Sequence, residues 1–179
     1  FESLNSTGLA LAEGDKIRNY VLMGLPPKEQ NRYYTEYWEK IEKCTNHDVS
    51  AFVRDYLSIK QQMTPNVNAV YRAFKEYVEK VQLPIDKLLD ELLRYARLFE
   101  KLQTCKSGLG ERRLDDSLYR MSRLEITVHR PFLMEVLRLN QDGKLSAESV
   151  RDIFEIVENY LFRRNVCEVP TNALNKIFL

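Results

Sequence analysis

Apolar residues recur at three- and four-residue steps along almost the whole chain, and this spacing predicts amphipathic helices. The clearest stripe follows Pro84 and consists of Ile85, Leu88, Leu89, Leu92, Ala96, Phe99 and Leu102. We expect it to form a buried helix that ends at the glycine-containing loop 106–110. Strict alternation of apolar and polar residues is absent, apart from a short candidate strand at 1–4. The pattern therefore predicts an all-α protein, an irregular multi-helix bundle of about eight or nine helices.

The other expected helices are bounded by residues that commonly begin or end helices. Asp48 and Ser146 are suitable N-caps, and Gly24 is a suitable C-terminal stop. We expect Tyr34, Trp38 and Ile41 to line one side of the second helix. The expected segments are 13–23, 28–44, a helix after Asp48, 67–81, 114–128, 132–139, a long helix after Ser146 and a short one after 170–171.

Composition and charge narrow the classes of function. The chain has 179 residues, of which 44% are hydrophobic and 30% charged, values that fit one globular domain. With 27 basic and 26 acidic residues the net charge is +1, so only a local patch would attract DNA or an anionic membrane. No apolar run is long enough to predict a membrane span, and no signal peptide is recognisable. Three widely spaced cysteines are not a disulfide framework, which favours a cytoplasmic location.

The sequence predicts neither a catalytic site nor a metal site in this chain. Residues 140–143 resemble the middle of an EF-hand loop, but Arg138 and Ser149 occupy the first and twelfth ligand positions, so too few oxygen ligands remain. Cys44 and His47 form a Cys-x-x-His pair without a second pair, whereas a closed zinc site needs four ligands. The chain has only two histidines, and they are far apart, which argues against a hydrolytic triad or a nuclease site.

Two groups of arginines are candidates for contact with DNA or with another domain. The first group falls within about a 100° arc if its segment is one helix, and such a stripe can bind phosphates. Neighbouring carboxylates dilute its charge, so a solvated helix face is the favoured interpretation and DNA contact the alternative. The second group ends the long helix, where cations also favour the helix dipole. The two groups are Arg112, Arg113, Arg120 and Arg123, and Arg163 with Arg164.

The N-terminal turn Asn5-Ser6-Thr7-Gly8 and the helix after it form the best candidate binding element. A small polar turn beside a helix N-terminus presents backbone N–H groups that can bind an anion. Helix capping explains the same residue types, so the turn alone leaves both interpretations open. The chain opens on Phe1 inside this block, and we expect it to be part of a longer protein.

The residues of this block resemble the N-terminal domain of GmrSD-type modification-dependent restriction endonucleases. The family pattern is Phe-x-x-x-Asn-x-x-Gly-x-x-Leu-x-x-x-Asp-x-x-Arg-Asn, which is matched from Phe1 through Asn5, Gly8, Leu11, Asp15, Arg18 and Asn19. A second block, 160–167 followed by 171–175, is similar to a later part of the same domain. The resemblance implies that residues 1–10 end a ParB-like nucleotide-binding segment and that 11–179 form its helical domain. The family's Asp-Gly-Gln-Gln-Arg motif and its HNH histidines are not in this sequence.

The resemblance also implies a nucleotide site. Asn5 would orient phosphate or metal, Ser6, Thr7 and Gly8 would offer backbone N–H groups, and Arg18 would neutralise phosphate charge. Asp15 and Asn19 complete the candidate set, with Asp15 alternatively pairing with Arg18 or capping the helix. The implied cofactor is a nucleoside triphosphate with Mg²⁺, bound by the full-length protein and not tightly by this chain alone.

The implied partners are the rest of the ParB-like segment, a downstream nuclease domain and DNA, without a membrane. The intact protein would be a restriction or phage-defence enzyme that couples nucleotide hydrolysis to cleavage of modified DNA, while this chain itself would be inactive. Two alternatives remain open: a helical scaffold that binds other proteins, and a helical DNA-binding module without nucleotide chemistry.

Overall fold

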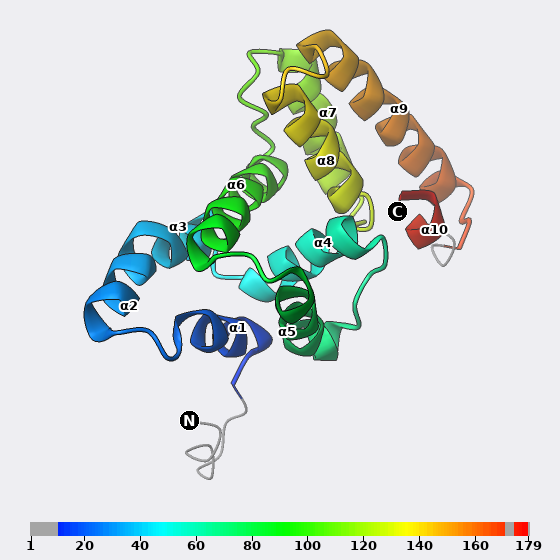
Figure 1. The fold of residues 1–179 in the computed structure, drawn as a ribbon. Helices are drawn as coiled ribbons and strands as arrows, with labels where there is room; N and C mark the ends of the chain where they lie inside the picture. Colours follow the sequence, from blue (N-terminus) through cyan, green and yellow to red (C-terminus); the bar gives the residue numbers. More distant parts are fainter. Residues whose placement is uncertain (1–10, 171–173, 179) are drawn as a thin grey trace.

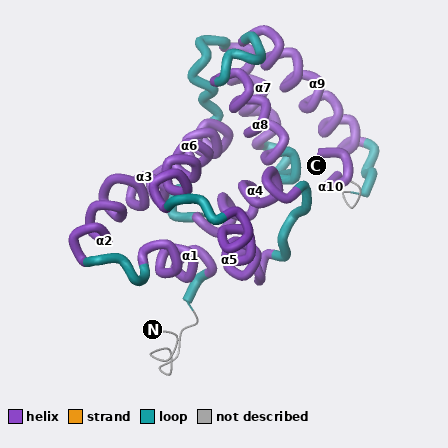
Figure 2. The backbone as a smooth tube through the Cα atoms, in the orientation of Figure 1, coloured by secondary structure: helices purple, strands orange, loops and turns teal. Residues whose placement is uncertain are grey.

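The chain folds entirely into helices and connecting loops over the residues that the computed structural model describes, 11–170 and 174–178 (Figures 1 and 2). Counting α2, η2 and α3 as one continuous helix, these residues form nine α-helices, which confirms the all-α prediction. The candidate strand at 1–4 lies outside the described residues. The elements are α1 (Glu13–Leu22), α2 (Pro27–Tyr33), the π-helical η2 (Tyr34–Trp38), α3 (Glu39–Cys44), α4 (Val49–Gln61), the 3₁₀-helical η3 (Val67–Ala69), α5 (Val70–Val81), α6 (Ile85–Thr104), α7 (Arg112–Ser122), α8 (Arg130–Gln141), α9 (Ala147–Val166) and α10 (Leu174–Phe178).

Helix α6 is the central element of the fold. Figure 1 shows α6 running from the group formed by α1 to α5 towards α7, α8 and α9. Its Phe99 is fully buried, with its ring centroid 5.7 Å from that of Phe52 in α4 and 5.0 Å from the guanidinium carbon of Arg130 in α8. The apolar stripe predicted from the sequence is thus buried against both neighbouring groups. The buried residues of α6 are Leu88, Leu89, Leu92, Leu93, Tyr95, Ala96, Leu98, Phe99 and Leu102.

The capping residues identified in the sequence perform the expected roles. The Asp48 carboxylate accepts the Ala51 N–H at 3.0 Å, and the Ser146 hydroxyl accepts the Ser149 N–H at 3.1 Å. Each bond satisfies an N–H group that a helix start would otherwise leave unpaired. Gly24 follows α1 with a φ of 82°, a left-handed conformation that suits glycine.

The largest difference from the predicted helix boundaries is at the end of α7. The expected helix 114–128 ends at Ser122 instead, and a non-helical segment, 123–129, precedes α8. The partly buried Leu124, Ile126 and Val128 explain this, because their two-residue spacing cannot place all three on one helix face. Glu125 also adopts a left-handed φ of 55°, which breaks the helix.

The second expected helix is continuous but contains a π turn, Tyr34–Trp38. Trp38 and Ile41 are each 1% exposed, and the Trp38 indole donates to Glu42 Oε1 at 2.9 Å. Tyr34, which we expected to line one side of this helix with them, is 36% exposed and does not share their burial. The π turn changes the angular register between Tyr34 and the residues that follow, and sequence periodicity does not reveal such a change.

The start of α5 is capped by a residue from a distant part of the chain. Its N-cap position is Ala69, which has no side-chain acceptor. Glu13 of α1 supplies one instead, because its Oε2 accepts the Tyr71 N–H at 2.7 Å while its Oε1 accepts from Lys16 at 2.8 Å. Partial burial alone would raise the Glu13 pKa, but these two hydrogen bonds hold the pKa below its ordinary value.

We predict that Glu13→Ala lowers the free energy of unfolding by about 1 kcal/mol, the usual cost of losing a helix cap. Because the Glu13 pKa is lower in the folded protein, this contribution is present above the unfolded pKa and is lost as the pH falls through the folded value. Urea denaturation at neutral and acidic pH measures both effects. Glu76→Ala on α5, whose exposed carboxylate pairs with Arg72, is the matched control and should change stability little. Equal stability losses for the two variants would contradict the capping role.

Candidate functional site

The candidate nucleotide-binding residues divide into two groups. Asn5, Ser6, Thr7 and Gly8 lie outside the described residues, so their predicted role stays a prediction. Asp15, Arg18 and Asn19 are described, and all three lie on α1 with their side chains partly exposed.

A cleft of about 350 Å³ lies between α1 and the helix formed by α2 and η2. Two of the three described candidates, Arg18 and Asn19, line it. The cleft combines one guanidinium, three side-chain amides and the exposed ring of Tyr34 with apolar surface, a mixture typical of small-molecule sites. Its lining residues are Arg18, Asn19, Leu22, Met23, Pro27, Gln30, Asn31 and Tyr34.

The Arg18 guanidinium is held at the edge of this cleft by two carboxylates. Its Nη2 lies 3.1 Å from Asp15 Oδ1, and its Nη1 lies 3.3 Å from Glu42 Oε1. The alternative that Asp15 pairs with Arg18 is therefore confirmed. Glu42 is itself fixed by the Trp38 indole, so the position of Arg18 depends on the buried part of the π-containing helix. One cation facing two carboxylates gives the cleft no surplus positive charge.

The arginines of α7 do not share one open face. Arg113 Nη2 lies 2.9 Å from Glu155 Oε1, and Arg120 Nη2 donates to Glu158 Oε2 at 2.9 Å, so both side chains bridge to α9. Arg112 lies 3.9 Å from Asp116 on its own helix. Arg123 is exposed in the turn after α7. Two of the four predicted arginines, Arg113 and Arg120, therefore join α7 to α9. Their ion pairs lower the positive charge available to an external phosphate.

The two arginines at the end of α9 differ from each other. Arg163 is exposed in the last turn, as the helix-dipole interpretation allows. Arg164 instead donates to the Tyr160 hydroxyl at 3.1 Å and to the Pro170 carbonyl, so it holds the segment that leads to α10.

Sequence reasoning missed a charged cleft of about 590 Å³ between α4, α6 and α8. Opposite charges pair within it: Lys60 with Glu91, and Arg138 with Glu135. Tyr95 donates to Glu135 Oε2 at 3.2 Å, and burial of its ring raises the Tyr95 pKa. The Lys60–Glu91 pair links α4 to α6, and the Arg138–Glu135 pair joins two residues within α8. This arrangement is typical of structural ion pairs. The cleft residues are Ile59, Lys60, Lys87, Asp90, Glu91, Arg94, Tyr95, Glu135 and Arg138.

The EF-hand-like turn takes part in the same network. The Asp142 carboxylate pairs with both Arg94 and Arg138, which the sequence separates by 44 positions. The hydrogen bond from Arg94 lowers the Asp142 pKa, and the positive charges of Arg94 and Arg138 add to this effect. Among the described residues, no three His, Cys, Asp or Glu side chains lie together as a metal site would require.

A buried polar group also joins α4 to α8. Asp55 is 5% exposed, and its Oδ2 lies 3.0 Å from Arg130 Nε. Burial raises the Asp55 pKa to about 7 although Arg130 opposes the shift. The neighbouring His129 is 7% exposed, and burial, helped by Arg130, lowers its pKa to about 4. Neutral His129 is therefore the dominant form at physiological pH. No sequence motif marks this group, because α4 and the start of α8, which are far apart in the sequence, assemble it.

Searches against protein-family models, curated proteins and solved structures found no match to this chain. None of the described helices combines the length and the apolarity that a bilayer crossing requires.

We predict that Arg120→Glu destabilises the protein by about 1 kcal/mol, since it places a carboxylate beside Glu158 at the α7–α9 interface. Arg120→Glu combined with Glu158→Arg should recover most of that loss, which urea denaturation measures. Arg123→Glu, which changes charge equally in the exposed turn, is the control and should stay close to the wild-type stability. A double variant no more stable than Arg120→Glu alone would contradict a stabilising interhelical pair.

Proposed function

We propose that this chain is the helical part of a GmrSD-like restriction or phage-defence protein and that the α1–α2 cleft completes its nucleoside-triphosphate pocket. One observation carries the proposal. Arg18 and Asn19, which belong to the family-like block, both line this cleft. They lie in the second half of α1, the first helix of the described chain, which follows closely after residues 1–10 in the sequence.

The chemistry of the cleft suits part of a nucleotide. A guanidinium recognises phosphate through paired N–H donors, and Asp15 and Glu42 hold that of Arg18 in place. The amides of Asn19 and Asn31 can donate to phosphate or sugar oxygens, and the Tyr34 ring offers a surface for a base. The volume of about 350 Å³ is in the usual range for small-molecule sites. When bound with Mg²⁺, the triphosphate would supply the hydrolysis energy that drives the intact protein.

The charge of the cleft explains why a partner segment is needed. Asp15 and Glu42 offset the Arg18 cation, so the described residues alone would hold a triphosphate weakly. The ParB-like segment would add the missing donors, together with Asn5 and the turn that follows it. We therefore place both nucleotide turnover and DNA cleavage in the intact protein, with the nuclease domain and DNA as its partners.

The helix packing offers a route from the cleft to the rest of the chain. Movement of α2 and η2 around a nucleotide would change the packing of Trp38 and Ile41 on α6. Helix α6 also packs against α8, and α8 against α9. The state of the nucleotide would thus reach the C-terminal helices through contiguous buried side chains.

The DNA-binding alternative receives less support, because Arg113 and Arg120 are used in ion pairs with α9. A scaffold without nucleotide chemistry is the alternative that the following experiment separates from the proposal.

We predict that Arg18→Ala in the full-length protein weakens nucleotide binding about 10- to 100-fold, the effect of removing one charge-assisted hydrogen bond. Asn19→Ala should cost about 5-fold, as expected for a neutral donor. A labelled nucleotide analogue measures affinity, and phosphate release with and without modified DNA measures turnover. Arg72→Ala on α5 is the matched control, since its exposed guanidinium pairs only with Glu76 among the described residues.

Circular dichroism establishes that each variant is folded before nucleotide binding is compared. Unchanged affinity and turnover in folded Arg18→Ala and Asn19→Ala proteins would contradict the nucleotide role and favour the scaffold. Equal losses in Arg72→Ala would show that the effect is not specific to the cleft.

A further inference from the structure

A second pocket, of about 150 Å³, lies where α6, α7 and α8 meet, away from the α1–α2 cleft. His129 and Arg130, the residues at the start of α8, contribute an imidazole and a guanidinium to its lining. The rest of the lining comes from α6, α7 and the turn segment before α8, and it is apolar at Leu102, Leu118, Met121 and Ile126 and polar at Gln103, Ser122 and Thr127. The lining residues are Leu102, Gln103, Leu118, Met121, Ser122, Ile126, Thr127, His129 and Arg130.

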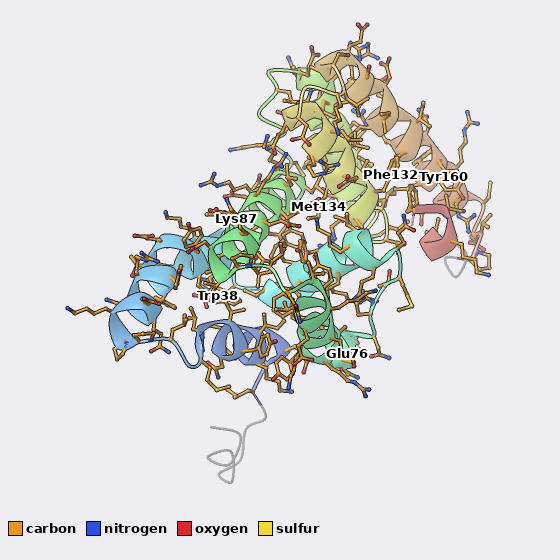
Figure 3. The ribbon with its side chains drawn as sticks, in the orientation of Figure 1. Trp38, Glu76, Lys87, Phe132, Met134 and Tyr160 are labelled. Atoms are coloured by element: carbon orange, nitrogen blue, oxygen red, sulfur yellow. The ribbon has the colours of Figure 1, made fainter. Side chains whose placement is uncertain are left out.

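The His129 side chain has unused hydrogen-bonding capacity at this pocket. It is 7% exposed, and its Nδ1 has no hydrogen-bond partner among the described residues. Its ring packs edge-on to Phe178 at a centroid distance of 6.4 Å, and Figure 3 labels the neighbouring Phe132 and Tyr160 beside α10. Buried imidazole nitrogens usually have a partner. An acceptor or donor in the pocket would satisfy this one.

The Arg130 guanidinium also has an N–H donor without a hydrogen-bond acceptor among the described residues. Its Nε lies 3.0 Å from Asp55 Oδ2, but these two atoms are not aligned as a hydrogen bond, and neither has another partner in the described chain. Its guanidinium stacks over Phe99 at 5.0 Å. A guanidinium offers five N–H donors in a planar fork, a shape that matches a carboxylate.

We propose that this pocket binds a short-chain carboxylate, with its head group at Arg130 and His129 and its alkyl end against Leu118, Met121 and Leu102. The pocket has the volume of roughly five water molecules, which suits a ligand of about six non-hydrogen atoms such as butyrate. A phosphate would fit the cation but would leave the three buried apolar side chains without a partner.

Binding such a ligand requires a proton. Asp55 already balances Arg130, so a second carboxylate would leave one uncompensated buried negative charge. Asp55 can take up the proton, since burial raises its pKa to about 7. The charges that act on Asp55 are Arg130 from α8 and Arg54 and Asp48 from its own helix, while adjacent His129 is neutral. The ligand should therefore bind more tightly below pH 7 than above it.

Isothermal titration calorimetry of the unsubstituted protein with sodium butyrate tests the proposal. The compounds n-butylamine and n-butanol are the matched ligands. We expect butyrate to bind about 10-fold more tightly at pH 6 than at pH 8, with uptake of up to one proton in buffers of different ionisation enthalpy. Neither matched ligand should compete with it. Leu118→Phe, which fills the apolar wall, should abolish binding, and Tyr119→Phe on the exposed side of α7 should leave it unchanged.

Asp55→Asn provides a second test that keeps the pocket lining intact. It should bind butyrate with equal affinity at pH 6 and pH 8 and without proton uptake. Three results would overturn the proposal: no heat from butyrate at millimolar concentration, equal binding of butylamine, or undiminished binding by folded Leu118→Phe.

Discussion

Burial of α6 on two sides is the constraint on which the rest of the structure depends. A helix with nine buried side chains cannot be covered by one neighbour. Helices α3, η2 and α4 therefore pack on one side of α6, and α8 packs on the other. Phe99 occupies the junction, in contact with Phe52 of α4 and below the Arg130 guanidinium of α8. Burial of each large apolar side chain of this stripe contributes about 1.5–3 kcal/mol relative to exposure, more than any surface ion pair described above.

The geometry of the two candidate binding sites depends on the packing of α6. The π-containing helix packs on α6 through η2 and α3, which carry the buried Trp38 and Ile41. The Trp38 indole holds Glu42, and Glu42 holds Arg18 at the α1–α2 cleft. At the other end, Leu102 of α6 forms one wall of the pocket beside His129 and Arg130. Small surface clefts of this kind keep their shape only if the elements that form them are held rigidly, and the α6 core supplies that rigidity.

The sequence predicted what short-range spacing determines. The α6 stripe, the N-caps Asp48 and Ser146 and the stop at Gly24 all follow from local rules. Other features depend on tertiary contacts and were not predictable. Helices α4, α5 and α6 end at left-handed Gln62, Gln82 and Cys105 instead of glycine, and Glu13 caps a helix 58 positions away. The inward orientation of Arg113 and Arg120 depends on where α9 packs. The candidate site was predicted only in part: Arg18 and Asn19 do share a cleft, whereas the charged cleft and the Asp55–Arg130 pair arise from helices far apart in sequence.

The central claim is that α6 joins the α1–α5 group and the α7–α9 group into one cooperative core. The most direct test is urea unfolding of Phe99→Ala, followed by both far-ultraviolet circular dichroism and the fluorescence of Trp38, the only tryptophan in the chain. Trp38 is buried in η2, which packs on α6, so its fluorescence reports on the α1–α5 group. We predict a single transition in which both signals coincide, with the free energy of unfolding lowered by about 3–5 kcal/mol. A Trp38 transition that stays at the wild-type urea concentration while the helical signal is lost earlier would contradict the account.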